Sequence, residues 1–426
     1  MGVRIMFIDM ASKVAYGKHV ITAGFVLLCG ILISGCDPGN ATLSQAASTP
    51  TPTVTPTPAA RLLVSDNTSN AVDVVDATTD LITATVAVAS PGKMVSAGGT
   101  TIIQSTLSSS IAIFDNATQT IRFTVVLPAQ PVDVAITPDG TTAWVAENNG
   151  TVQSISTATS AATNTFAVAG VQRIALGPQG TTVLAFGDTN ATSFAAILPT
   201  GLVPSIGNST LDHPTNAVFF GVDQNFILLN CGIECGGIQP SIADVQLTPP
   251  LGGGPSISTP LGVSGATVGL LSGATLFVAG SPGASNTSIN GLNTGTLQVA
   301  NSQSTTVGTP FQIADGRHNL MTLTSNGRLY IGATGCTLGA PNAQNLRQGC
   351  LTIFDTVAQT VTPVLLPALR LNGDVTAMTP VTGRNVVYVA HGGVIDIFDI
   401  TTNAVSTTAV PPVPPGTVFG VVQLSP

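Results

Sequence analysis

Three histidines after residue 60 are the side chains best suited to bind a metal ion or to transfer a proton. His213 lies eleven residues before Gln224 and His318 lies nine residues before Gly327, which are equivalent turn positions of a repeat described below. Five further polar residues lie at about the same level of their own units: Asp133, Arg173, Asn216, Arg317 and Asp374. Polar groups that converge at the mouth of a channel could bind a small anion, or a metal with His213 and His318 as ligands. The alternative is a hydrated rim that binds no ligand.

Four cysteines of the same region form two local pairs in the sequence. Cys231 and Cys235 lie in LNCGIECGG, and Cys336 and Cys350 bracket the insertion GCTLGAPNAQNLRQGC. Four cysteines allow three pairings, and local pairing is favoured because the two insertions belong to units that are not adjacent. A zinc site with four thiolate ligands is the alternative, but the spacing lacks a CxxC pair. We therefore expect two disulfides in an oxidising compartment.

Four aspartates recur at one position of the repeat, each at the end of a strand and before a turn: Asp76, Asp115, Asp355 and Asp399. In other units, Ser156 and Asn301 occupy this position. These residue types predict side chains that hydrogen-bond to turn amides rather than paired catalytic carboxylates. The sequence also lacks a GxSxG nucleophile motif and a glycine-rich phosphate loop. Serine hydrolase and nucleotide-binding chemistry therefore have no support in the sequence.

The N-terminal segment predicts export from the cytoplasm. Residues Val20 to Ser34 form an apolar run of 15 residues that follows Lys13 and Lys18. This run is shorter than the roughly 20 apolar residues of a spanning helix and fits a secretory signal. It ends in Ile-Ser-Gly before Cys36, which resembles the bacterial lipobox and implies that Cys36 is diacylated and becomes the mature N-terminus. A cleaved signal with an incidental cysteine is the alternative.

Translation could begin at Met1 or at Met10, since MASKVAYGKH is the more typical basic start of a signal. After the cysteine, the segment from Asp37 to Ala60 contains a Thr-Pro alternation, which favours an extended chain that would reach about 75 Å. We therefore divide the chain into a signal peptide (1–35), a lipidated cysteine with a stalk (36–60) and a repeat domain (61–426).

The composition excludes one class of partner. Charged residues make up 8% of the 426 residues, whereas soluble domains carry about a quarter. The net charge is −8; the leader carries +2 and the remainder, from Cys36, carries −10 with Lys93 as its only lysine. Nucleic-acid binding depends on clustered Lys and Arg. We therefore expect no nucleic-acid partner.

From Arg61 onward the sequence repeats a unit of four short strands with alternating apolar and polar residues. Turn residues mark the units at Gly99, Gly140, Gly180, Gln224, Gly273, Gly327 and Gly383, with spacings of 41, 40, 44, 49, 54 and 56 residues. A period of about 40 to 45 residues with four strands is typical of propellers. We expect an all-β propeller of eight four-stranded blades, with seven as the alternative. The C-terminal TVFGVVQL, Thr417 to Leu424, should complete the first blade and close the ring.

Two of these units carry a resemblance to a known family. VYVAHGGVIDIFDITTNAV (Val387 to Val405) and WVAENNGTVQSISTATSAAT (Trp144 to Thr163), with the PDG turn at Pro138 to Gly140, resemble the YVTN-type β-propeller repeats of bacterial envelope proteins. The resemblance covers about residues 61 to 426 and implies the fold and an envelope location. WD-type and kelch repeats fit less well, because Trp144 is the only tryptophan.

These patterns together predict a monomeric, non-enzymatic lipoprotein of the cell envelope, on the periplasmic or outer surface. The lipid on Cys36 would attach it to a membrane, and its loops would bind a protein or a cell-wall polymer. No cofactor is expected, apart from a metal if His213 and His318 bind one. Two alternatives stay open: a propeller hydrolase or lactonase that uses this metal, and a structural spacer. The sequence does not distinguish the membrane or the leaflet.

Overall fold

The computed structural model describes residues 60–187, 191–248, 254–282, 295–303, 305–336, 351–362, 374–391, 393–405 and 418–425. All of them belong to one compact unit, Thr57–Pro426. The predicted signal peptide, the lipidation site Cys36, the stalk and Cys350 lie outside the described residues. Within the described ranges, no helix is long and apolar enough to span a membrane.

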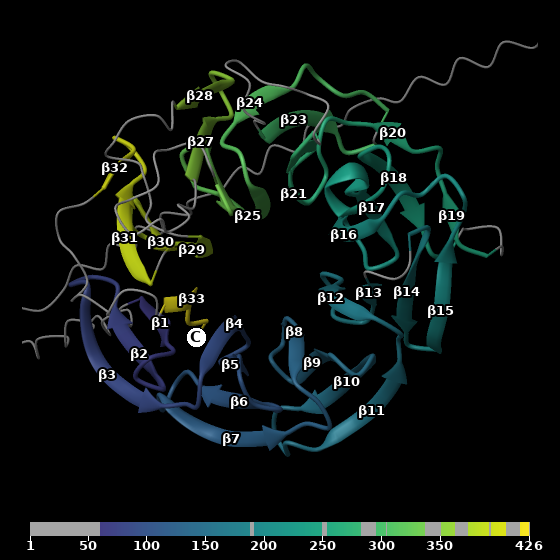
Figure 1. Ribbon diagram of the computed structural model, residues 1–426. Helices are drawn as coiled ribbons and strands as arrows, with labels where there is room; N and C mark the ends of the chain where they lie inside the picture. The colour runs from purple at the N-terminus through teal and green to yellow at the C-terminus, as the bar shows by residue number, and fades with distance from the viewer. Residues whose placement is uncertain are drawn as a thin grey trace, which may run out of the picture. The chain divides into compact units, whose positions relative to one another are not determined.

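The described strands form eight antiparallel sheets arranged in a ring, which is an eight-bladed β-propeller (Figure 1). This confirms the all-β prediction and the count of eight blades. We number the blades by chain order, and each contains four strands from the axis outward. Blade 5 has an additional short strand at its outer edge.

The innermost strands of blades 1 to 8 are β33 (Val418–Gln423), β4 (Pro91–Ala97), β8 (Pro131–Ile136), β12 (Val171–Leu176), β16 (Pro214–Phe219), β21 (Val268–Ser272), β25 (Arg317–Leu323) and β29 (Val375–Pro380). The second strands are β1 (Arg61–Asp66), β5 (Thr100–Ser105), β9 (Thr142–Glu147), β13 (Val183–Gly187), β17 (Asn225–Asn230), β22 (Thr275–Gly280), β26 (Arg328–Thr334) and β30 (Val386–His391).

The third strands are β2 (Ala71–Asp76), β6 (Ser110–Asp115), β10 (Thr151–Ser156), β14 (Ser193–Leu198), β18 (Ser241–Gln246), β23 (Gly295–Asn301), β27 (Leu351–Asp355) and β31 (Val394–Asp399). The outer strands are β3 (Leu81–Ala87), β7 (Thr120–Val126), β11 (Ala162–Ala167), β15 (Gly201–Gly207), β19 (Ser256–Ile257) with β20 (Leu261–Gly262), β24 (Phe311–Ile313), β28 (Thr360–Thr362) and β32 (Ala404–Val405). One short 3₁₀ helix, η1 (Gly232–Cys235), follows β17 among the described residues.

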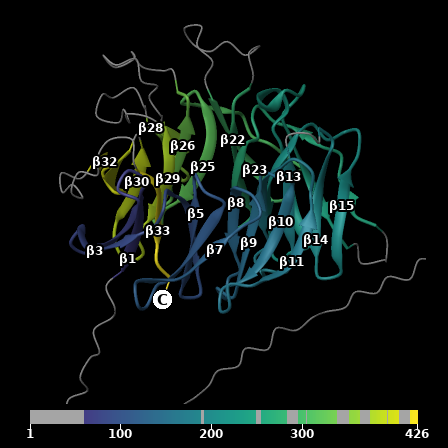
Figure 2. The same ribbon diagram turned by 60° about the horizontal axis from the view of Figure 1, so that its bottom comes forward.

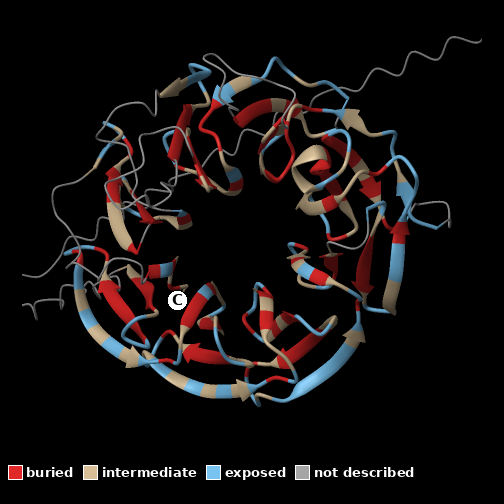
Figure 3. Cartoon of the chain, in the orientation of Figure 1, coloured by how far each residue is buried: buried red, intermediate tan, exposed pale blue. Residues whose placement is uncertain are grey.

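The apolar residues of each blade lie on both of its faces and pack against the two neighbouring blades. On β1, for example, Leu62 and Val64 pack against blade 8, whereas Leu63 packs against blade 2. This arrangement follows from the period of two along a strand. Figure 3 shows the consequence: the second and third strands are mostly buried, and outer strands such as β7 and β11 are largely exposed. The interfaces between blades therefore form the core.

The C-terminal strand closes the ring. β33 pairs antiparallel with β1, with Leu63 opposite Val422 and Val64 opposite Val421. Blade 1 thus contains the innermost strand from one end of the repeat domain and three strands from the other, as the sequence predicted. Figure 2 shows the strands of successive blades side by side around the ring, with β33 next to β1.

Strand register places two kinds of segment at one end of the ring. In blade 5 the start of the innermost strand, Pro214, lies opposite the end of the second strand, Asn230. In blade 7, Arg317 lies opposite Thr334 in the same way. Residues that begin the innermost strands and residues that follow the second strands therefore share this end. It is the end at which the sequence predicted the candidate ligands.

Candidate functional site

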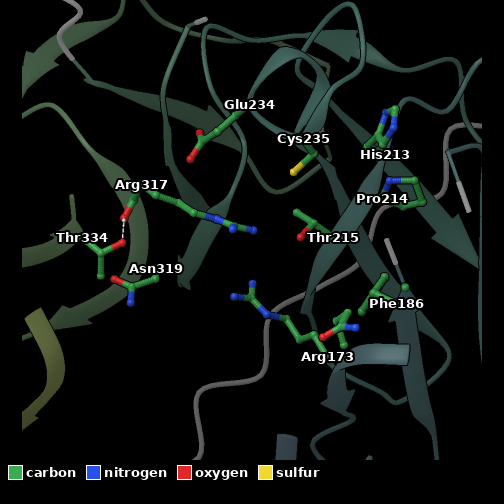
Figure 4. A pocket seen from close by; sticks show the side chains of 12 residues that line it. Arg173, Phe186, His213, Pro214, Thr215, Glu234, Cys235, Arg317, Asn319 and Thr334 are labelled. Carbon is green, nitrogen blue, oxygen red and sulfur yellow. Dashed lines mark hydrogen bonds between the residues drawn. The ribbon is translucent and has the colours of Figure 1, made fainter. Parts of the chain in front are cut away.

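A cavity of about 680 Å³ lies between blades 4, 5 and 7 at this end of the ring. Its walls come from the beginnings of the innermost strands, the ends of the second strands and η1. Figure 4 shows the side chains that line it. The residues are Gln172, Arg173, Phe186, Gly187, His213, Pro214, Thr215, Glu234, Cys235, Arg317, Asn319 and Thr334.

Two arginines from different blades extend into this cavity. Arg173 belongs to β12 of blade 4 and Arg317 begins β25 of blade 7, and Figure 4 shows both guanidinium groups directed toward the middle of the cavity. Neither group has an ion-pair or hydrogen-bond acceptor among the described residues. Burial lowers the pKa of Arg173, Asp133 opposes this effect, and the charge of Arg317 lowers it further. The cavity therefore holds two repelling positive charges that an anion would stabilise.

Glu234, on η1, lines the cavity beside Arg317 (Figure 4). Its Oε2 accepts a hydrogen bond from the backbone N–H of Ser281 at 2.8 Å, and the Ser281 hydroxyl donates to the carbonyl oxygen of Gly316, also at 2.8 Å. Burial raises the pKa of Glu234, while the Ser281 N–H and the charge of Arg317 lower it. Glu234, Ser281 and Gly316 thus link blades 5, 6 and 7 beside the arginines.

A disulfide holds η1 in place. Cys231 and Cys235 are bonded, which confirms the predicted local pairing for this pair. Gly232 begins η1 with φ 55°, and a Cβ there would lie 2.2 Å from the carbonyl carbon of Gln239. The carboxylate of Glu234 is therefore carried by a short, cross-linked turn. Cys336 is also disulfide-bonded, but its predicted partner Cys350 is not among the described residues.

His213 also lines the cavity, immediately before β16. Its Nδ1 lies 2.8 Å from Oδ1 of Asp212, and its backbone has φ 56°. Oδ2 of Asp212 accepts the N–H groups of Ile238 at 2.5 Å and Gln239 at 2.7 Å. The carboxylate therefore fixes the orientation of the imidazole. A second cavity of about 680 Å³ shares His213 as a wall residue.

The other predicted candidates lie outside the cavity. The carboxylate of Asp133 pairs with Lys93 and accepts the N–H of Ile174 at 2.9 Å, and so links blades 2, 3 and 4. Oδ1 of Asn216 accepts the N–H of the following residue at 2.9 Å. Oδ1 of Asp374 accepts the N–H of Gly335 at 2.7 Å. These three side chains have structural partners.

His318 is not among the residues that line the cavity. It is 1% exposed and packs against Gly295, where an added Cβ would lie 2.2 Å from Cε1 of the histidine. Burial lowers the pKa of His318 from 6.5 to about 4. Across the described ranges, no group of three His, Cys, Asp or Glu side chains is arranged to hold a metal. The proposed metal site at these two histidines stays a prediction.

Sequence reasoning did not single out Glu234, Asn319 or Thr215, which line the same cavity. For Glu234 a signal was available, since it is the only acidic residue between two cysteines of the predicted local pair. A carboxylate inside so short a disulfide loop has its position determined by the cross-link. Asn319 and Thr215 carry no comparable pattern.

No family model matches the sequence, and no curated protein matches it either. Solved structures with a similar fold include dihydro-haem d1 dehydrogenase NirN in complex with DHE, with a TM-score of 0.62 and 10% identity over 85% of this chain and 75% of that one. Hydrazine synthase of Kuenenia stuttgartiensis aligns with a TM-score of 0.53 and 15% identity over 74% of this chain and 94% of that one. A protein of unknown function from Desulfotomaculum acetoxidans gives 0.52 and 12%, over 86% and 99%. At these identities the likeness concerns the propeller fold alone.

Proposed function

We propose that this chain is a lipid-anchored propeller of the bacterial cell envelope that binds an anionic ligand without converting it. The observation that carries the binding role is the pair of guanidinium groups, Arg173 and Arg317, that share one cavity and have no acceptor among the described residues. Ligand cavities of about 300 to 1,000 Å³ commonly contain a few such convergent polar groups. An acidic cell-wall polymer or an acidic protein segment fits this chemistry.

The envelope location rests on the N-terminal sequence. The apolar run before Cys36 and the Thr-Pro stalk after it support export and lipidation, and the resemblance of the repeats to YVTN-type envelope propellers agrees with them. On this proposal the stalk holds the binding domain away from the membrane, where it can reach large ligands.

The anchor can be tested by lipid labelling. Cells that express the full-length protein are grown with an alkyne-tagged fatty acid, and the protein is compared with a Cys36→Ser variant. We expect label and membrane association for the unchanged protein, and loss of both for the variant, because the thiol of Cys36 carries the diacylglyceryl group. Equal membrane retention of an unlabelled Cys36→Ser protein would rule out this anchor.

The binding role can be tested with the full-length protein in detergent, by calorimetric titration of trigalacturonate at low salt. Each charge-assisted hydrogen bond contributes about 1.5 to 3 kcal/mol, so Arg173→Gln or Arg317→Gln should weaken binding at least about tenfold. Arg122→Gln is the matched control, since Arg122 lies on the outer strand β7 and pairs with Asp115. It should bind like the unchanged protein.

Two results would contradict the proposal. The first is failure of the unchanged protein to bind either trigalacturonate or a smaller carboxylate. The second is equal binding by the Arg173→Gln/Arg317→Gln double variant. Recovery of the ligand in chemically altered form would instead favour the hydrolase alternative, and His213 with Asp212 would then be the first pair to replace.

A further inference from the structure

The disulfide between Cys231 and Cys235 meets the cavity through only one of its two cysteines. Cys235 lines the cavity and is partly exposed, and Figure 4 shows its Sγ directed into the cavity. Cys231 is not a lining residue and is 0% exposed. A thiol exchanges with a disulfide by attacking a sulfur atom that it can reach. A small thiol in the cavity can therefore attack Cys235 but not Cys231.

The charges of the cavity select the kind of thiol. Arg173 and Arg317 line the same cavity as Cys235, and Figure 4 shows both guanidinium groups directed toward its middle. Glu234 is the acidic residue among the described lining residues, and burial raises its pKa, which reduces the opposing negative charge. Two guanidinium groups beside one such carboxyl group attract an anion. A thiol that also carries a carboxylate would be concentrated next to Cys235, whereas a neutral thiol would not.

The turn that carries the disulfide is also held by backbone hydrogen bonds. The N–H of Cys231 donates to the carbonyl oxygen of His213 at 3.0 Å, and the N–H of Gly237 donates to that of Gly232 at 2.9 Å. The N–H of Gly236 donates to the carbonyl oxygen of Ile233 at 3.1 Å. None of these bonds involves sulfur. They favour the return of two reduced cysteines to bonding distance, so that the disulfide can form again.

We propose that the bond between Cys231 and Cys235 is a thiol–disulfide exchange site for small thiols that carry a carboxylate, which the two arginines hold. The thiolate attacks Sγ of Cys235 and forms a new sulfur–sulfur bond, while Cys231 leaves with the electron pair and takes a proton from water. A second thiolate attacks the sulfur that the first one contributed, and Cys235 leaves as a thiolate. Two thiols are thus oxidised to one disulfide, and the protein disulfide is reduced to two thiols. This activity goes beyond the proposed binding role, since an acid without a thiol would bind unchanged.

The first test compares two thiols of similar size on the full-length protein. Mercaptoacetate carries a carboxylate and 2-mercaptoacetamide is neutral, and each rate is divided by the rate of the same thiol with hydroxyethyl disulfide. Alkylation and peptide mass spectrometry count the reduced Cys231–Cys235 pair separately from the other cysteines. We expect mercaptoacetate to be favoured at least about tenfold, because a positively charged cleft raises the local concentration of an anion.

Substitution of the arginines should remove this preference. Arg173→Gln and Arg317→Gln should each reduce it severalfold, and the double variant should abolish it. Arg122→Gln is the matched control and should keep it in full, since Arg122 lies on β7 and pairs with Asp115. These measurements use the unchanged disulfide, so they do not depend on how the protein folds without it.

The second test identifies the sulfur that is attacked. Cys231→Ser and Cys235→Ser both remove the cross-link, and each leaves one thiol to form a mixed disulfide with dithiodiglycolate, the oxidised form of mercaptoacetate. We expect Cys235 to react at least about tenfold faster than Cys231, because only Cys235 faces the cavity. Thermal melts check that the two variants are equally folded.

Three results would overturn the proposal. The first is a disulfide that resists mercaptoacetate while hydroxyethyl disulfide is reduced, since the bond would then be a structural cross-link only. The second is equal normalised rates for the two thiols, and the third is equal reaction of Cys231 and Cys235 in the single variants. The titration with trigalacturonate involves no thiol, so the binding role can stand where the exchange activity fails, and the reverse.

Discussion

At the scale of single residues, the recurring aspartates have a structural role. Oδ1 of Asp115 accepts the N–H groups of Ala117 and Thr118, each at 3.0 Å, and Asp76, Asp355 and Asp399 accept the equivalent pairs in their turns. These bonds, together with Arg122, lower the pKa of Asp115 to about 2. The prediction of turn-capping side chains is confirmed. Asn301 accepts two turn amides as well.

A buried histidine makes stability depend on pH. The unfolded chain protonates His318 near pH 6.5, whereas the folded protein does so only near pH 4. Between these values the unfolded state binds the additional proton, so stability falls as pH decreases from 6.5 to 4 and levels off below. The expected loss in the free energy of unfolding is roughly 3 kcal/mol.

Urea unfolding at several pH values between about 7 and 4 tests this prediction. His318→Leu removes the titrating group and should flatten the profile over this range. Leu320→Ala, on the same strand β25 and without a titrating group, is the control: it should lower stability by a similar amount at every pH and leave the slope in place. A slope that is unchanged in His318→Leu would assign the pH dependence to other groups.

At the scale of elements, η1 shows how a loop between strands becomes part of a site. The turn follows β17, carries Glu234 and is closed by the bond between Cys231 and Cys235. It contacts the start of blade 5 through the N–H of Gly232, which donates to the carbonyl oxygen of Asp212 at 3.1 Å. The cross-link and this contact hold the carboxylate at the cavity wall.

Removing the cross-link should destabilise the protein modestly and weaken ligand binding. The two cysteines are separated by 4 positions, and closing so short a loop contributes about 2 kcal/mol in the chain-entropy model. We expect Cys231→Ala/Cys235→Ala to lower the free energy of unfolding by about this amount in denaturant titrations. Far-ultraviolet circular dichroism should remain that of a β protein. Unchanged stability would mean that the contacts of η1 alone define its conformation.

At the scale of the whole molecule, the ring is closed by more than the pairing of β33 with β1. Asp80, at the turn after β2, accepts hydrogen bonds from Arg384 and from the hydroxyl of Tyr388 in blade 8. Its side chain is 7% exposed. The pKa of Tyr388 is raised, first by burial and then by Asp80. A buried carboxylate therefore joins the first blade to the last.

Replacing this carboxylate should loosen the closure. Asp80→Asn keeps a residue type that tolerates the backbone φ of 60°, but it removes the charge that faces Arg384. We expect a loss of about 2 to 3 kcal/mol in the free energy of unfolding in urea titrations, because the guanidinium stays partly buried without its counterion. Asp355→Asn disrupts the pair with Arg328, in which the carboxylate is more exposed than that of Asp80, and should cost clearly less because solvent screens it. Equal costs for both variants would contradict a special role for Asp80.

The sequence alone determined the blade architecture, because period-two alternation and turn chemistry are local properties that recur in every unit. It also placed the polar candidates at one end of the ring. Only the tertiary structure decided which of them meet. His213 and His318 have similar spacings from their turns, yet His213 lines the cavity and His318 is buried. His318 lies before the bulge of β25, whereas Arg173 follows the bulge of β12 and enters the cavity. A shift of one residue reverses the face of a side chain, and this choice depends on contacts between blades that no local pattern encodes.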